Sequence, residues 1–497
     1  MSDSYLLAVP PRYVHTWLRK VNVSFVPGPL TRSLHEVVNR LLERFHTLGH
    51  KVQPSPEKDT DLILTTAPFG EPISWREALL FTVRHRYRMR HNPVIYTLLH
   101  VSRGRFRRFL EHLKRALGRE SPCREDYDFP GLVPHAYKTI YEQGRRGGPI
   151  LALERILQAQ AKSIRILLVV GDEHPIEAYN FDLVGAHPRT DASDPQFFYD
   201  DIILRMVTAA STGQVTDHQV VGDPIPYTVW QSLKTPSAMY QAAKQLGSRN
   251  FFTDAVRISD LVHVPVFTEV IAAQYSEGCF ATWDTSLNAL VSTITGSARP
   301  FDKYNVTEND LTVIVGVRPD GKGALVRHVE GKRNDPPSSE AVEMMNMDGY
   351  LPRIMLEVES GQRVHVPVVR SKLHGHRGVA AYDPRRVEYT PLEEPYLHYP
   401  VSCSTDAQAR AIVEAFARAQ SLQNPDDPRQ VAFTVLPGHG IMIAEKWVSG
   451  KAPFQIVWEY MDAGYLQIEN FIPQGPFSYE EAQDGRLVRS GSDYLTV

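Results

Sequence analysis

The chain has 497 residues, of which 42% are apolar and 22% charged, a composition typical of a soluble globular protein with more than one hydrophobic core. Its 54 Lys and Arg nearly balance its 57 Asp and Glu, which argues against a protein dedicated to nucleic acid or to a membrane surface. Three dispersed cysteines (Cys123, Cys279 and Cys403) argue against a disulfide framework and suit a reducing compartment.

The start of the chain gives no sign of export. Its first residues, Met-Ser-Asp-Ser-Tyr, lack the basic and apolar regions of a secretory signal. No apolar run approaches the roughly 20 residues that a membrane-spanning helix needs. We therefore expect a cytoplasmic protein without a membrane partner.

The first third of the chain alternates helical and extended patterns. Apolar residues between Leu34 and Phe45 recur at helical spacing, and the run Leu62–Leu64 then predicts a buried strand. Val94–Leu99 predicts a second strand, and an amphipathic helix over 106–117 follows it. Strands and helices in this order predict a parallel sheet with covering helices.

A basic segment lies within this region. Residues 84–119 contain 11 Lys or Arg and one acidic residue, Glu111. The segment is either a phosphate or nucleic-acid patch or the solvated outer face of two helices. We favour the second interpretation, because the segment lacks stacking aromatics and any nucleic-acid motif.

The middle of the chain predicts a second α/β unit. An apolar strand is expected at Ile164–Val170, and the unit continues to about residue 305. Within it, Leu290, Val291 and Ile294 suggest a helix that packs onto the sheet.

After residue 305 the pattern changes to short β-branched or alternating runs separated by Gly, Pro and Asp, which is typical of antiparallel sheets and barrels. These runs cover 311–317, 324–329, 353–358, 363–369, 431–436 and 454–459, and one helix is expected over about 405–420. The predicted fold is therefore α/β, with two N-terminal Rossmann-like parallel-sheet domains (1–165 and 166–305) followed by a β-rich, barrel-like C-terminal domain (306–497).

Two carboxylates in the middle of the chain are candidate site residues. Glu277 sits in a Glu-Gly turn after an apolar stretch, at a position where the strand ends of α/β sheets bind ligands. Alternatively it is a carboxylate at a helix N-terminus, stabilised by the helix dipole. Asp302 follows 25 residues later in a loop introduced by Pro300, and is either the partner of Glu277 or a turn former.

A histidine near the carboxyl end has unusual neighbours. His439 lies between two glycines directly after the predicted strand 431–436, so the backbone can approach a ligand closely there. Together with two carboxylates it would complete a set that can hold a divalent cation and move protons. Glu445 further along the same strand either supports His439 or faces solvent.

A second group of polar residues lies at His374, His376 and Arg377. In an extended chain the two histidines point the same way, which allows metal binding. Lys372 and Arg377 would repel a cation, so we expect anion or hydroxyl recognition of a substrate there, or else a simple surface loop. The chain contains no phosphate loop, dinucleotide fingerprint, nucleophile elbow or kinase signature.

The order of these motifs resembles the L-fucose isomerase family of sugar ketol-isomerases. The corresponding residues are Glu277, Asn288-Ala289-Leu290, Thr295-Gly296, Pro300 to Asp302, and His439 with the apolar strand after it. Two features depart from the family: Cys279 stands where an acidic residue is common, and no His-His pair precedes the final strand.

The resemblance implies a site and an activity. By it, Glu277, Asp302 and His439 would coordinate Mn²⁺ or another divalent cation, and Glu277 and Asp302 would also shuttle protons. The expected function is a metal-dependent aldose–ketose isomerase acting on a deoxy sugar or a pentose, as a homo-oligomer without nucleic acid. The alternatives are a metal-dependent hydrolase or lyase, and a non-catalytic sugar- or phosphate-binding protein on the same fold.

Overall fold

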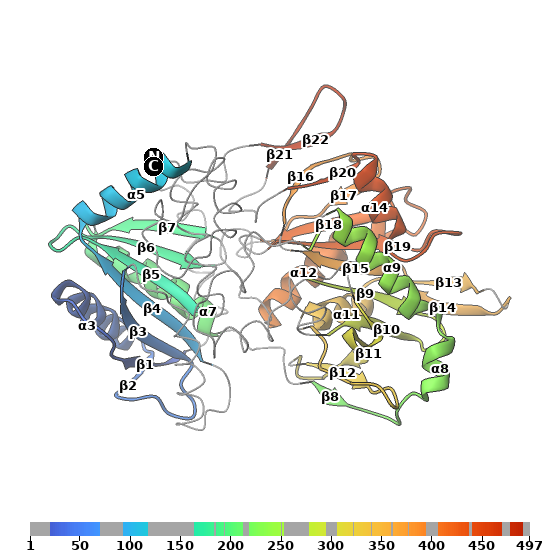
Figure 1. Cartoon of the computed structure of the whole chain (residues 1–497), viewed down its shortest axis with the longest axis horizontal. Helices are drawn as coiled ribbons and strands as arrows, with labels where there is room; N and C mark the ends of the chain where they lie inside the picture. Colours follow the sequence, from blue (N-terminus) through green and yellow to red (C-terminus); the bar gives the residue numbers. More distant parts are fainter. Residues whose placement is uncertain are drawn as a thin grey trace. The chain divides into compact units, whose positions relative to one another are not determined.

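The computed structural model describes residues 20–69, 93–117, 164–182, 185–192, 194–211, 218–249, 251–252, 278–294, 306–321, 323–338, 340–358, 361–375, 377–393, 406–436, 440–469 and 478–490 (Figure 1). The chain divides into two compact units. The first contains the described residues up to 211, and the second those from 218 onward. Each unit is described by itself.

The first unit is built on a seven-stranded sheet in the order β2-β1-β3-β4-β5-β6-β7. The strands are β1 (Asn22–Val26), β2 (Lys51–Gln53), β3 (Leu62–Pro68), β4 (Val94–Val101), β5 (Ile164–Val170), β6 (Glu177–Asp182) and β7 (Gly185–Thr190). The first five in this order run parallel, and β6 and β7 are antiparallel at one edge. This is the parallel sheet that the sequence predicts, and its first five strands follow a common doubly wound order.

Helices cover both faces of this sheet. They are α3 (Arg32–Thr47), α5 (Arg103–Leu117) and α7 (Pro195–Ser211). Thr31 caps the start of α3, because its hydroxyl accepts a hydrogen bond from the amide of Leu34. The buried residues of α3 run from Leu34 to Phe45 at the predicted spacing. α3 and α7 pack on one face, where Leu62, Tyr96 and Leu167 form the core with them.

On the other face, α5 buries Phe106 and Phe109. Phe109 meets Phe69 edge to face at 5.5 Å. Arg107 and Arg108 on the same helix are exposed. In its described part, this portion of the basic segment is therefore the solvated outer face of a helix.

The second unit is built on a nine-stranded sheet in the order β17-β18-β19-β15-β9-β10-β11-β12-β8. Its strands are β8 (Gln219–Val220), β9 (Cys279–Asp284), β10 (Ala289–Thr293), β11 (Leu311–Val317), β12 (Ala324–Arg327), β15 (Val369–Gly375), β17 (Val387–Tyr389), β18 (Val431–Leu436) and β19 (Gly440–Lys446). All neighbours pair antiparallel except the two short edge strands, β8 and β17. Among the described strands the sheet is open, with β8 and β17 at its ends, so the β-rich prediction holds without a closed barrel.

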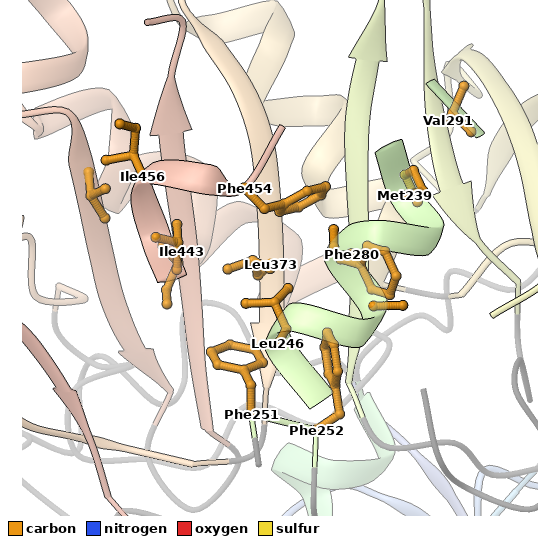
Figure 2. Packing of buried hydrophobic residues seen from close by; sticks show 14 of the residues in the cluster. Met239, Leu246, Phe251, Phe252, Phe280, Val291, Leu373, Ile443, Phe454 and Ile456 are labelled. Carbon is orange, nitrogen blue, oxygen red and sulfur yellow. The ribbon is translucent and has the colours of Figure 1, made fainter. Parts of the chain in front are cut away.

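Two layers of helix cover this sheet. On one face, α9 (Lys234–Ser248) and α14 (Gln455–Asp462) pack over a core that includes Phe280, Leu373 and Ile443 (Figure 2). Phe251 and Phe252 follow α9 and join this core, where Phe252 stacks on Phe280 at 5.3 Å. On the other face, α11 (Glu340–Tyr350) and α12 (Asp406–Arg418) enclose a second core. The helix predicted over 405–420 is thereby confirmed.

Smaller elements complete the unit. They are α8 (Tyr227–Ser232), α13 (Gln420–Gln423), the 3₁₀ turn η4 (Glu308–Asp310), the hairpin β13 (Arg353–Glu357) with β14 (Arg363–Pro367), and a sheet in the order β20-β16-β22-β21. The last consists of β16 (Val379–Tyr382), β20 (Leu466–Ile468), β21 (Ser478–Glu481) and β22 (Leu487–Ser490).

Two sequence predictions of secondary structure were wrong. The helix suggested by Leu290, Val291 and Ile294 is instead β10, which forms a hairpin with β9. Its residues are buried on both faces, and a continuous apolar run does not distinguish a central strand from a buried helix. The strand expected over 454–459 is instead α14, whose buried Ile456, Val457 and Tyr460 share one helical face.

The compact units also differ from the expected domain boundaries. β4 and β5 pair along their length, so residue 165 lies inside one sheet. The described strands between 166 and 305 are divided between the two large sheets, with β9 and β10 in the antiparallel one. No described helix is long and apolar enough to cross a membrane.

Candidate functional site at one edge of the nine-stranded sheet

The three predicted metal ligands, Glu277, Asp302 and His439, lie outside the described residues, and so does His376. The strands that border them are described. Their register therefore establishes which chain ends are neighbours.

β15 lies between β9 and β19 and is antiparallel to both. Cys279, the first residue of β9, is opposite His374, and His374 is opposite Met442. Three strand ends are consequently adjacent: the start of β9, the end of β15 and the start of β19. They lie along one edge of the sheet, meaning an edge formed by the ends of the strands and not by an outermost strand. Because neighbouring strands are about 5 Å apart, these ends span roughly 10 Å.

The adjoining strands reach the same edge. Gly440 at the start of β19 is opposite Leu436 at the end of β18. β10 pairs with β9, with Ser292 opposite Ala281, so β10 ends where β9 begins. The described residues Gly278, Ile294, Leu436 and Gly440 therefore all lie at this edge. This edge is the candidate site.

Glycine permits the close packing of the backbone at this edge. Gly278 has a φ of 61°, and a Cβ on it would collide with the carbonyl oxygen of His374. A Cβ on Gly375 would lie 2.7 Å from the ring of Phe251. Contact with β15 thus requires glycine at position 278.

His374 is fully buried, so it does not belong to a surface loop. Its Nδ1 lies 3.0 Å from the carbonyl oxygen of Ile441. Because a carbonyl oxygen only accepts hydrogen bonds, this contact assigns the proton to Nδ1 and makes Nε2 an acceptor in the neutral ring. Histidines that bind metals commonly have this arrangement.

The other members of this group have partners inside the unit. The Nζ of Lys372 lies 2.7 Å from the carboxylate of Asp348 on α11, and both side chains are buried. Its charge is therefore compensated and does not oppose a cation at the edge. The guanidinium of Arg377 is half-buried and lies 3.5 Å from the carbonyl oxygen of Glu469.

Glu445 neither faces solvent nor lies at this edge. It is opposite Ser371 and Val431, toward the other end of β19. Its carboxylate accepts hydrogen bonds from two backbone amides at the start of α14, those of Phe454 at 2.7 Å and Val457 at 3.1 Å. Burial raises the pKa of Glu445 to about 7, although these two hydrogen bonds favour the charged form.

Sequence reasoning missed the buried Lys372–Asp348 ion pair, the burial of Glu343 on α11, and the anchoring role of Glu445. The signal for Glu343 is visible in the sequence. Residues 340–344 read Glu-Ala-Val-Glu-Met, which places two acids one helical turn apart on a helix with buried apolar residues.

Comparison with protein-family models gives no match, and comparison with curated proteins gives none either. Among solved structures, YgbL of Escherichia coli, proposed to be an aldolase, epimerase or decarboxylase, aligns at a TM-score of 0.26 and 13% identity. The alignment covers 46% of this chain and 84% of YgbL. A likeness at this TM-score establishes neither fold nor activity.

No three His, Cys, Asp or Glu side chains in the described part of the chain are grouped closely enough to hold a metal ion. The predicted ligands are outside that part. Among the described residues at the edge, His374 has the imidazole ring and the tautomer that are common in metal ligands.

The carboxyl edge of the parallel sheet in the first unit is a second place where ligands bind in α/β folds. Three described side chains near this edge form hydrogen bonds with backbone groups. Thr66 Oγ1 accepts the amide of Gly28, Ser33 Oγ donates to the carbonyl oxygen of Asp172, and His100 Nε2 contacts the carbonyl oxygen of Gly171, each at 3.0 Å. These bonds connect the loop after β1 to β3, and connect α3 and β4 to the loop after β5.

Proposed function

We propose that the protein is a divalent-metal-dependent aldose–ketose isomerase that acts on a deoxy sugar or a pentose at the edge of the nine-stranded sheet. One observation supports this most strongly. The residues implied by the resemblance to L-fucose isomerases are 25 and 137 positions apart in sequence, yet the strands bordering all three end at adjacent positions of one sheet.

The reaction requires a proton to move between two adjacent carbons. In the proposed mechanism, Glu277 or Asp302 removes the proton from the carbon next to the carbonyl and returns it to the neighbouring carbon. A bound Mn²⁺ ion would stabilise the negative charge that develops on the two oxygens. The carboxylate that faces the substrate is the base, because ligands of one ion need not share a pKa.

Described residues would support this chemistry. Gly278 and Gly375 allow the chain ends to approach closely, and His374 has Nε2 as an acceptor at the same edge. Asp348 neutralises the buried charge of Lys372, so Lys372 would not repel a bound cation.

The test is a panel of aldoses incubated with protein and Mn²⁺, scored for ketose formation and for deuterium uptake from solvent. We expect one or more pentoses or deoxy sugars to react, and Glu277→Gln and Asp302→Asn to lower turnover at least 100-fold. Glu357→Gln on the exposed hairpin β13–β14 is the matched control and should retain activity. If no sugar exchanges deuterium while the protein binds Mn²⁺ stoichiometrically, the isomerase proposal is wrong.

A further inference from the structure

The hairpin of β13 and β14 forms a two-stranded sheet of its own in the second unit. Figure 1 shows the hairpin extending from that unit. One side of β13 pairs with β14, and no described strand pairs with its other side. β14 leads into the start of β15, whereas the candidate site lies at the end of β15. The hairpin is therefore separate from the proposed isomerase centre.

The register of the hairpin establishes which backbone groups of β13 face outward. In an antiparallel pair, opposite residues alternate between those that exchange two hydrogen bonds and those that exchange none. The amide of Val358 donates to the carbonyl oxygen of Gln362 at 2.9 Å. Beyond the other end of the hairpin, the amide of Val368 donates to the carbonyl oxygen of Pro352, also at 2.9 Å. The even-numbered residues of β13 therefore bond to β14, and the odd-numbered residues point their backbone groups outward.

The outward-facing residues of β13 are Arg353, Met355 and Glu357. Their amides and carbonyl oxygens have no hydrogen-bond partner among the described residues. Their side chains are exposed, whereas Ile354 and Leu356 are half-buried and pack against the second core of the unit. An unpaired strand edge of this kind is a template for another strand.

The charges on β13 are symmetric about its centre. Arg353 and Glu357 lie two positions before and after Met355. If two copies of β13 pair antiparallel about Met355, each Arg353 is opposite the partner's Glu357, and each Ile354 is opposite the partner's Leu356. Charges on a free edge commonly prevent identical strands from associating. Here they have opposite signs at matching positions, so they favour association.

Both charged side chains also have contacts within their own hairpin. The guanidinium of Arg353 donates to the carbonyl oxygen of His365 at 2.6 Å and lies over the ring of Trp283 at 5.5 Å. Glu357 lies 3.8 Å from Arg363, and both of these side chains are exposed. A second copy would place Glu357 between Arg363 and the partner's Arg353.

The same register uses all of the outward-facing backbone groups. When Met355 is opposite the partner's Met355, three opposing pairs of residues exchange two hydrogen bonds each. Moving the centre by one residue would leave the groups of Arg353 or Glu357 unpaired. Backbone geometry and charge therefore select the same register.

We propose that β13 pairs antiparallel with the β13 of a second copy of this chain, with Met355 opposite the partner's Met355, and that this pairing joins two chains in a two-fold dimer. The proposal goes beyond the proposed function and does not depend on it.

The first experiment measures the mass of the full chain by sedimentation equilibrium from about 1 µM to about 100 µM, a range suited to a weak interface. We expect an equilibrium between monomer and dimer. Met355→Pro removes an outward-facing amide from each copy and no hydrogen bond to β14, so it should weaken the dimer at least tenfold. Met355→Leu keeps the amide and is the matched control. A monomer at every concentration, or a dimer that Met355→Pro leaves unchanged, would overturn the proposal.

A second experiment tests the charges with variants that keep all of the backbone amides. Glu357→Arg and Arg353→Glu each place like charges opposite one another in a homodimer, and each should weaken it. In an equimolar mixture the two variants should form a heterodimer, because every opposing pair again has opposite signs. A mixture that associates no more tightly than either variant alone would show that these residues do not face each other.

A third experiment tests the register. Met355→Cys should form a disulfide between copies under mild oxidation, because opposite residues of this kind lie about 5.5 Å apart. Glu357→Cys is the matched control, since its two copies would be separated by roughly 13 Å along the strands. The yields are read from a non-reducing gel, and equal yields from the two variants would contradict the proposed pairing.

Discussion

At the scale of single residues, the second unit uses buried charges in three different ways. Asp348 is neutralised by Lys372, Glu445 anchors the start of α14, and Glu343 has a single long hydrogen bond. Each environment predicts a different response to substitution, because the cost of a buried charge depends on what compensates it.

Glu445 makes stability depend on pH. Because its pKa is raised from 4.5 to about 7 in the folded protein, the native state binds the proton more tightly than the unfolded state does. The contribution of Glu445 to stability is therefore full below about pH 4.5 and is lost as the pH rises to about 7. The loss is on the order of 3 kcal/mol.

Glu445→Gln removes this titration. We expect the free energy of unfolding of the wild type, relative to the variant, to fall between pH 4.5 and pH 8, measured by urea denaturation across that range. A difference that stays constant, or that grows with pH, would contradict the assignment.

Gly278 is the residue at the candidate site whose identity the structure explains best. Gly278→Ala should destabilise the protein through two effects, a strained positive φ of roughly 1–3 kcal/mol and the collision with His374. Gly321→Ala is the control, since Gly321 also has a positive φ (71°) but has nothing near its Cβ position. Equal losses of unfolding free energy in the two variants would show that contact with β15 is unimportant.

At the scale of elements, the sequence predicts most of the described strands and helices of the first unit and several strands of the second. α3 is predictable because its buried residues follow a period of 3.6 and Thr31 caps it. β10 is not, because its residues are buried on both faces of a central strand and show no alternation. The turn before it depends on Asn288, which has a φ of 47°, and an asparagine alone does not announce a hairpin.

The candidate site is predictable only in part for the same reason. Motifs indicated residues 277, 302 and 439. The neighbouring positions of β9, β15 and β19 depend instead on long-range strand pairing, which no local pattern encodes. The burial of Glu343 and Lys372 was not predicted, because charged side chains usually indicate a solvated surface.

At the scale of the whole molecule, the chain contains two units with separate hydrophobic cores. We expect two transitions in calorimetric unfolding, since units with their own cores often unfold separately. Lys372→Met leaves Asp348 buried and uncompensated, which costs about 3–5 kcal/mol, so it should lower only the transition of the second unit.

Leu41→Ala opens a cavity beneath α3 and is the matched variant for the first unit. It should lower only the other transition, by about 2–5 kcal/mol of unfolding free energy. If each variant shifts both transitions equally, the units unfold as one cooperative body.

The central place of β15 between two antiparallel partners has an evolutionary consequence. The hydrogen-bond ladder holds the neighbouring chain ends in place, whereas the loops that leave them are free to lengthen, shorten or change composition. Proteins that share such a sheet can therefore evolve to bind new substrates through changes in their loops, while the pairing of the strands is retained.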